Sequence, residues 1–218
     1  MQNDGPTTRA VITAARPRGR PRAFDREAAL KSATRVFWSK GYGATSISDL
    51  TEAMGIGSPS LYAAFGSKEA LYAEALRHYE EKNAHLVWSG FDSAETTRGA
   101  VTSLLMDSAA ALTGCIADLP RGCMVTLSAV GSEGHAELGD LVHKARAVAF
   151  ERLEGRLGQG VIDGEIAASV DIHALARFVQ AVQAGMSILA RDGASRAELE
   201  DMVGMAMRGW ETRTQDSE

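Results

Sequence analysis

Apolar residues recur at helical spacing along most of the chain, and the first such stripe falls within residues 25–40. Asp25 stands before the stripe as a helix N-cap, and Gly41 follows it as a residue that ends helices. Because positions three and four apart share one face of a helix, this pattern predicts a helix here. Its buried face would consist of Ala29, Leu30, Ala33, Val36 and Phe37.

The next stretch, residues 46–65, predicts two short helices joined by a tight turn. Ser46 can cap the first helix, with an acidic residue three positions on. Gly55 stands where a left-handed residue ends a helix. We expect Ser58 to cap the second helix and Pro59 to occupy its first position, where the missing N–H costs nothing.

The second of these helices has one apolar face and a polar leading end. Leu61 and Phe65 share a face and would pack on the first helix. Ser58, Ser60 and Tyr62 then point elsewhere, near the exposed N-terminus of the helix. Two helices, a three-residue turn and a polar leading end predict a helix-turn-helix.

The remaining pattern is also helical. Ser67 can cap a fourth helix that reaches His85 or Trp88, and residues 88–93 would form a linker. The later helices are expected at 95–113, 120–132, 134–157, 171–191 and 195–211, with a loop at 158–165. The sequence therefore predicts an all-α fold of about nine helices.

The last two predicted helices carry more apolar surface than a single covering layer requires. Small residues among them would let another helix approach closely. We expect a dimer interface, a four-helix bundle made from two chains; the alternative is packing in the chain's own core. The interface residues would be Phe178, Ala181, Val182, Gly185, Met186, Leu199, Met202 and Trp210.

Charge is distributed unevenly along the chain. Residues 1–80 hold eleven lysines and arginines against eight acidic residues, whereas the remainder holds twelve against twenty. Such asymmetry indicates a polyanionic partner for the first part only. No apolar run reaches the roughly 18 residues that span a membrane, and the N-terminus has no apolar signal region, so we expect a cytoplasmic protein.

The N-terminal segment, residues 1–22, is expected to be a disordered basic arm. Within it, Arg18-Gly19-Arg20-Pro21 resembles the core of an AT-hook, which places arginines in the narrow minor groove of A/T-rich DNA. We expect Arg18, Arg20 and Arg22 to contact DNA. The alternative is a solvated basic tail.

Motifs for catalysis or cofactor binding are not found in the sequence. The five histidines have no metal-binding spacing, and no nucleophile elbow, phosphate loop or dinucleotide fingerprint occurs. We therefore expect no metal, no cofactor and no catalytic residue. A helical cytosolic enzyme with an accidental helix-turn-helix pattern remains an alternative.

The flanks of the helix-turn-helix resemble the TetR family of bacterial transcriptional regulators. The resemblance covers roughly residues 23–83 and is carried by Phe37, Gly41-Tyr42, Ala44-Thr45, Ile47, Gly55, Leu61-Tyr62, Phe65, Lys68 and Leu71. It implies a DNA-binding domain at 23–83 and a ligand-binding and dimerisation domain at 84–218. Ala63-Ala64 departs from the aromatic and polar pair that the family often has there.

The resemblance also implies how the chain acts. A homodimer would bind a palindromic double-stranded operator and leave it when a small apolar organic ligand binds. Beside the arm, DNA contacts are expected from Thr45, Ser46, Gly57, Ser58, Pro59, Ser60, Tyr62 and Lys68. Candidates for the ligand site are Leu104, Cys123, Met124, Phe150, His173 and Phe178. The alternative is a ligand-independent DNA-binding or interaction protein that keeps this fold and controls a protein partner.

Overall fold

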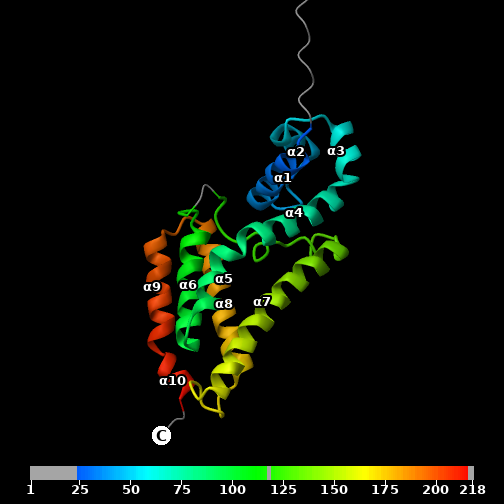
Figure 1. The fold of residues 1–218 in the computed structure, drawn as a ribbon. Coiled ribbons are helices and arrows are strands. Elements are labelled where there is room, and N and C mark those ends of the chain that lie inside the picture. The colour runs from blue at the N-terminus through cyan, green and yellow to red at the C-terminus, as the bar shows by residue number, and fades with distance from the viewer. Residues whose placement is uncertain (1–23, 117–118, 216–218) are drawn as a thin grey trace, which may run out of the picture.

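A computed structural model describes residues 24–116 and 119–215, and every regular element within them is a helix (Figure 1). The all-α prediction is confirmed, although this part of the chain holds ten helices rather than about nine. They are α1 (Arg26–Lys40), α2 (Ile47–Met54), α3 (Ser58–Phe65), α4 (Lys68–Asn83), α5 (His85–Ser93), α6 (Thr97–Leu112), α7 (Ala136–Ile162), α8 (Ile172–Arg191), α9 (Arg196–Arg208) and α10 (Trp210–Thr214).

The helices form two groups, which we call the head (residues 24–83) and the body (residues 84–215). Figure 1 shows α1, α2 and α3 together at one end of the molecule, and α4 running from them to the body. The long helix α7 extends along one side of the body and reaches back toward the head. Within the described residues, no helix is long and apolar enough to cross a membrane.

The short helices of the head begin and end at local signals, as expected. Asp25 accepts a hydrogen bond from the Ala28 N–H, and Ser46 forms a reciprocal capping box with Asp49. Gly55 ends α2 in the left-handed conformation, with φ of 66°.

The start of α3 corrects the sequence prediction by one residue. Gly57 is its N-cap, in an extended conformation, and Ser58 is already helical. The N–H groups of Ser60 and Leu61 both bond to the Gly57 carbonyl, so the helix begins before the proline. The hydroxyl of Ser58 therefore does not cap the helix.

The expected linker at residues 88–93 is wrong, because these residues belong to α5. Phe91 is buried in the body core, and this packing holds the segment as a helix against the body. Gly90 faces α6 closely: a Cβ there would lie 2.5 Å from the Asp107 carboxylate and 3.0 Å from the Ser103 Cβ. A glycine that looked like a turn signal therefore serves close helix packing.

The expected helix at 120–132 is also absent from the described residues; turns occupy this range instead. We call residues 119–135, which join α6 to α7, the strap. Gly122 has φ of 78°, and a Cβ there would lie 2.9 Å from the Ser187 carbonyl oxygen of α8. Its N–H bonds to the Leu112 carbonyl at 2.8 Å, so tertiary contacts fix a non-helical path.

Helix α7 continues to Ile162, five residues beyond its expected end. Gly160, expected in a loop, is buried in the helix, and a Cβ there would lie 2.5 Å from the Thr97 Oγ1. Close approach to the start of α6 explains this glycine. The chain turns only at Gly164, where φ is 76°.

Two clusters of buried apolar side chains hold the molecule together. The body cluster draws its buried members only from residues 91–210. The head cluster combines residues of α1–α4 with side chains from the strap and from α7, which are Met124, Val125, Val130, Leu138 and Val142. The head is thus completed by parts of the body.

Candidate nucleic-acid interface

The leading end of α3 is a solvent-facing polar surface. Ser58, Pro59 and Ser60 are exposed, as is Gly57 before them. Tyr62 has 47% of its surface exposed, although it lies one residue from a fully buried leucine. Hydroxyl groups and free helix N–H groups at such an end suit phosphate oxygens and base edges.

The opposite face of α3 anchors it in the head. Leu61 and Phe65 are buried, as expected. Arg26 stacks its guanidinium 4.5 Å from the Phe65 ring centre and pairs with Glu74 at 2.7 Å, and Phe24 contacts Phe65 edge-on. No local sequence pattern marks this cluster of contacts, because its members come from three separate segments of the chain.

Thr45 and Ser46 differ from the exposed contacts expected of them. Thr45 is buried, and its hydroxyl donates to the Gly41 carbonyl at 2.6 Å. Ser46 is exposed, but its hydroxyl is engaged with Asp49 in the capping box. Both residues primarily fix the turn that places α2.

Lys68 lies against an aromatic ring in the first turn of α4. Its Nζ is 4.2 Å from the centre of the Tyr42 ring, and the Tyr42 hydroxyl donates to the Glu69 carboxylate at 2.7 Å. Burial lowers the pKa of Lys68, and the Tyr42 hydrogen bond lowers the pKa of Glu69. The lysine is thus preorganised by its own chain, without requiring an anion to explain its position.

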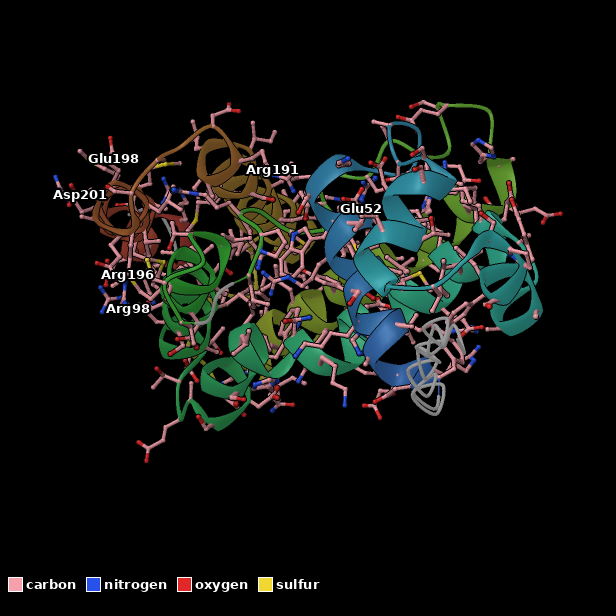
Figure 2. The ribbon with its side chains drawn as sticks, turned by 90° about the horizontal axis from the view of Figure 1, so that it is seen from above. Glu52, Arg98, Arg191, Arg196, Glu198 and Asp201 are labelled. Carbon is pink, nitrogen blue, oxygen red and sulfur yellow. The ribbon has the colours of Figure 1, made fainter. Side chains whose placement is uncertain are left out.

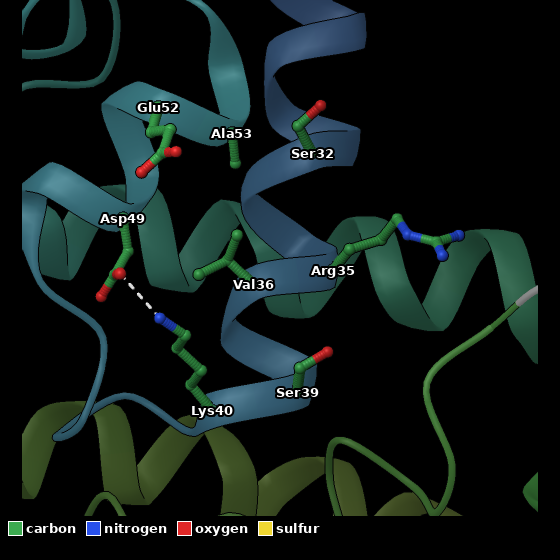
Figure 3. A pocket seen from close by; sticks show the side chains of 8 residues that line it. All are labelled: Ser32, Arg35, Val36, Ser39, Lys40, Asp49, Glu52 and Ala53. Carbon is green, nitrogen blue, oxygen red and sulfur yellow. Dashed lines mark hydrogen bonds and ion pairs between the residues drawn. The ribbon is translucent and has the colours of Figure 1, made fainter.

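A depression of about 550 Å³ lies between α1 and α2 (Figure 3). Lys40 and Asp49 form an ion pair across it at 2.6 Å. The Lys40 hydrogen bond and those of the capping box lower the pKa of Asp49 to about 2. This pair joins the end of α1 to the start of α2, and therefore holds the helix-turn-helix on the helix behind it.

The residues expected to line a ligand site belong to different parts of the molecule. Leu104 and Phe150 are buried members of the body cluster, whereas Met124 belongs to the head cluster. A second cavity, of about 170 Å³, lies between head, strap and α8, and Met124 is the one candidate among its lining residues. Leu104 and Phe150 therefore serve as core residues of the body.

Of the other ligand candidates, His173 packs edge-on against Phe150, with ring centres 5.1 Å apart, whereas Cys123 and Phe178 lie elsewhere. His173 is at the surface, with Nδ1 2.8 Å from the Glu154 carboxylate, and Phe178 is 36% exposed. Cys123 is in the strap, where its Sγ accepts a hydrogen bond from the Tyr79 hydroxyl at 3.2 Å. Its partner is a phenol rather than a base.

The expected dimer residues separate into two sets. Met186, Leu199 and Trp210 are buried in the core of their own chain, which is the alternative interpretation for these three. The others keep exposed or partly exposed surface on α8 and α9; they are Phe178, Ala181, Val182, Gly185 and Met202. Arg18, Arg20 and Arg22 lie outside the described residues.

A capped helix-turn-helix with a polar, exposed second helix, carried on a larger helical body, defines a DNA-binding regulator of bacterial type. The sequence pattern of the family described as "Bacterial regulatory proteins, tetR family" matches residues 29–75. The HTH-type transcriptional repressor ComR of Escherichia coli (strain K12) is 37% identical over 196 residues, 88% of this chain and 92% of ComR. The chain belongs to the TetR family of transcriptional regulators, which are not enzymes.

Two other similar proteins are also transcriptional regulators. The HTH-type transcriptional repressor BdcR of Escherichia coli (strain K12) is 48% identical over 61 residues, 28% of this chain and 31% of BdcR. A cysteine mutant of the TetR family transcriptional regulator CifR, solved in complex with 26-base-pair double-strand operator DNA, is 40% identical. That comparison covers 88% of this chain and 100% of the CifR chain, with a TM-score of 0.81.

Proposed function

We propose that the protein is a dimeric repressor that binds a palindromic operator and inserts the leading end of α3 into the major groove. The observation that carries this proposal is the exposure of Ser58, Ser60 and Tyr62 on a helix that buries Leu61 and Phe65. The TM-score of 0.81 to a chain bound to operator DNA supports a head orientation close to the DNA-binding one. A cytoplasmic location fits a protein whose partner is the chromosome.

Within this proposal, the other residues expected to contact DNA act in different ways. Tyr62 reaches a phosphate or a base edge, and the free N–H groups at Gly57 and Ser58 bind phosphate. Lys68, held by the Tyr42 ring, supplies a positive charge beside the DNA phosphate backbone. Pro59 shapes the helix start, Thr45 and Ser46 act through the turn, and the basic arm with Arg18, Arg20 and Arg22 follows the minor groove.

Binding of the pure protein to DNA from its own promoter region tests the proposal. Titrations at several salt concentrations, with random DNA beside the promoter DNA, separate specific from nonspecific binding. We expect a saturable complex with two protomers or a multiple of two, tighter than on random DNA and weakened by salt. Equal affinity for promoter and random DNA, with genomic fragments likewise unselected, would refute a repressor of this kind.

The dimer that we propose forms through α8 and α9. Their outward faces expose Phe178, Ile188, Leu189 and Met205 to solvent in the single chain. Gly185 on α8 and Gly204 on α9 have open space where a side chain would be, so packing within the chain does not require them. Apolar surface beside glycine suits a helix of a second copy at close range.

Gly185→Arg tests this interface. The added side chain meets nothing within its own chain, so we expect the fold to remain while the dimer dissociates in analytical ultracentrifugation. Gly155→Arg is the matched control, because Gly155 is an exposed glycine of α7 with equally open surroundings. A Gly185→Arg protein that stays dimeric would place the interface elsewhere.

We further propose that a small apolar organic effector releases the operator, as is typical of the family. One observation favours the ligand-independent alternative. The two cavities described above are lined by head residues, not by body helices alone. Screening small organic compounds for release of the bound operator separates the two. Release at saturating compound, without unfolding, supports the effector; a cognate operator that no compound class releases supports the alternative.

A further inference from the structure

Arg191, the last residue of α8, binds three backbone carbonyls in two other parts of the chain. Its Nε donates to the Arg121 carbonyl at 2.8 Å, its Nη1 to the Ser39 carbonyl at 2.9 Å, and its Nη2 to the Trp38 carbonyl at 2.8 Å. Figure 2 shows Arg191 at the side of the body that faces α1. One side chain of the body therefore reaches the strap and the head together.

The two carbonyls in the head are among the unpaired groups at the end of α1. The helix ends at Lys40, and the N–H of Gly41 already bonds to the Phe37 carbonyl. The carbonyls of Trp38 and Ser39 have no later helical N–H to accept from. A guanidinium satisfies both, and its positive charge lies at the negative end of the helix dipole.

The strap strengthens the same junction. The Trp38 Nε1 donates to the Gly122 carbonyl at 2.8 Å in a buried hydrogen bond. The next N–H in the strap, that of Cys123, donates to the Ser187 hydroxyl of α8 at 2.8 Å. Helix α1 is thus joined to the strap and the strap to α8, and Arg191, at the end of α8, contacts both α1 and the strap.

The guanidinium of Arg191 is suited to holding several carbonyls in fixed positions. Partial burial lowers the pKa of Arg191, although a guanidinium remains charged in proteins. A half-buried cation whose donors point along fixed directions is less free to shift than an exposed one. A lysine also has three N–H donors, but they share one nitrogen, so it cannot reproduce the bonds that Nε, Nη1 and Nη2 make from three separate atoms.

We propose that Arg191 is a positioning residue, which fixes the angle between the head and α8 and thereby sets the spacing of the two recognition helices. The inference rests on the proposed function, because spacing matters only to a dimer that reads two half-sites. Helix α8 carries the proposed dimer face, so a bond from its end to α1 relates each head to the partner subunit.

Operator binding by Arg191→Ala and Arg191→Lys tests the proposal. The operator is first mapped by footprinting with the unaltered protein, and versions with two base pairs added or removed between the half-sites are then prepared. We expect Arg191→Ala to weaken binding to the natural operator on the order of tenfold. It should also discriminate less between the natural and altered spacings, whereas Arg191→Lys should fall between the two proteins.

Arg196→Ala is the matched control. Arg196 lies on α9, on the far side of the body from α1 in Figure 2, and pairs with Glu200 at 2.6 Å. Its removal should leave both affinity and spacing preference unchanged. Unaltered binding by Arg191→Ala would overturn the inference, and so would an equal loss on every spacing, which indicates a general folding defect.

Hydrogen exchange supplies a readout that does not depend on DNA. In the Arg191→Ala dimer, amides at residues 38–42 and 121–124 should exchange faster, while those of α6 and α9 should not change. Unchanged exchange at these residues would show that Arg191 does not hold the head and the strap to α8. If the unaltered protein bound no DNA, the proposed function would fail, and this exchange experiment would still decide whether Arg191 holds the head.

Discussion

The two hydrophobic clusters differ in where their residues come from. The body cluster is built from the body alone, with Leu104, Met186 and Leu199 almost completely buried. The head cluster extends into the strap and α7 through residues such as Val130 and Leu138. The head therefore takes part of its core from the body, so a substitution in the strap or in α7 can disturb the head without touching α3.

Leu104→Ala should have the largest effect, because it opens a cavity in the centre of the body cluster. Leu104 is 1% exposed, so we expect a loss of about 3 to 5 kcal/mol in the free energy of unfolding. Chemical denaturation followed by circular dichroism measures it. Leu104→Met, which conserves volume, should cost less than about 1.5 kcal/mol. A mild Leu104→Ala phenotype would show that the body core is loosely packed.

Leu138→Ala tests the asymmetry directly. Leu138 is on α7 but packs in the head cluster, with 6% of its surface exposed. We expect a loss of about 2 kcal/mol, expressed as faster hydrogen exchange in α1 and α4 rather than in α6 or α9. Leu141→Ala, three residues on and 38% exposed, is the control and should change little. Faster exchange throughout the body instead would contradict the assignment of Leu138 to the head.

Tyr62→Ala should affect DNA binding but not stability. Since almost half of the side chain is exposed, little packing is lost. Operator affinity should fall by about 1 to 2 kcal/mol, roughly 5- to 30-fold, with affinity for random DNA reduced less. Tyr62→Phe separates the hydroxyl from the ring. Undiminished operator binding by the alanine variant would remove Tyr62 from the interface.

Asp49→Asn should have the smallest effect, and that effect should depend on pH. The folded-state pKa of Asp49 is lowered from 3.8 to about 2, so its ionised form favours the folded state. That stabilisation is complete above pH 3.8 and is lost as the pH falls through 2. The melting temperature of Asp49→Asn should therefore lie below that of the unaltered protein at pH 7, and the two should converge in acid.

Glu52→Gln is the control for this comparison, because it removes one charge from the same helix outside the cap. Its melting temperature should follow that of the unaltered protein across the pH range. A difference between Asp49→Asn and the unaltered protein that persists unchanged near pH 2 would mean that the side-chain geometry, rather than the charge, stabilises the start of α2.

The sequence predicts the head well because its signals are local. A cap, a left-handed glycine and a three- or four-residue apolar spacing act within a few positions, as at Asp25, Ser46 and Gly55. The glycines at 90 and 160 mislead because the same residue type marks both turns and close helix contacts. Only the three-dimensional neighbour distinguishes these roles.

The candidate site divides in the same way. The exposure of Ser60 and Tyr62 follows from helical periodicity within α3. The burial of Thr45 and the ring beneath Lys68 depend on which side chains the fold brings together. The contact between Arg191 and Ser39 joins residues 152 positions apart, and a backbone carbonyl as acceptor leaves no mark in the sequence.

The composite head core has a consequence for building chimeric regulators. A cut at residue 83 would transfer α1–α4 to a foreign body without Met124, Val130 or Leu138, and would leave apolar surface uncovered on both pieces. A DNA-binding domain that can be transferred would instead have to include the strap and the first turns of α7. Otherwise the receiving body would need a strap of the same shape. Under the proposed function, exchanging only the outward residues of α3 should change the DNA target and keep the native contacts between head and body.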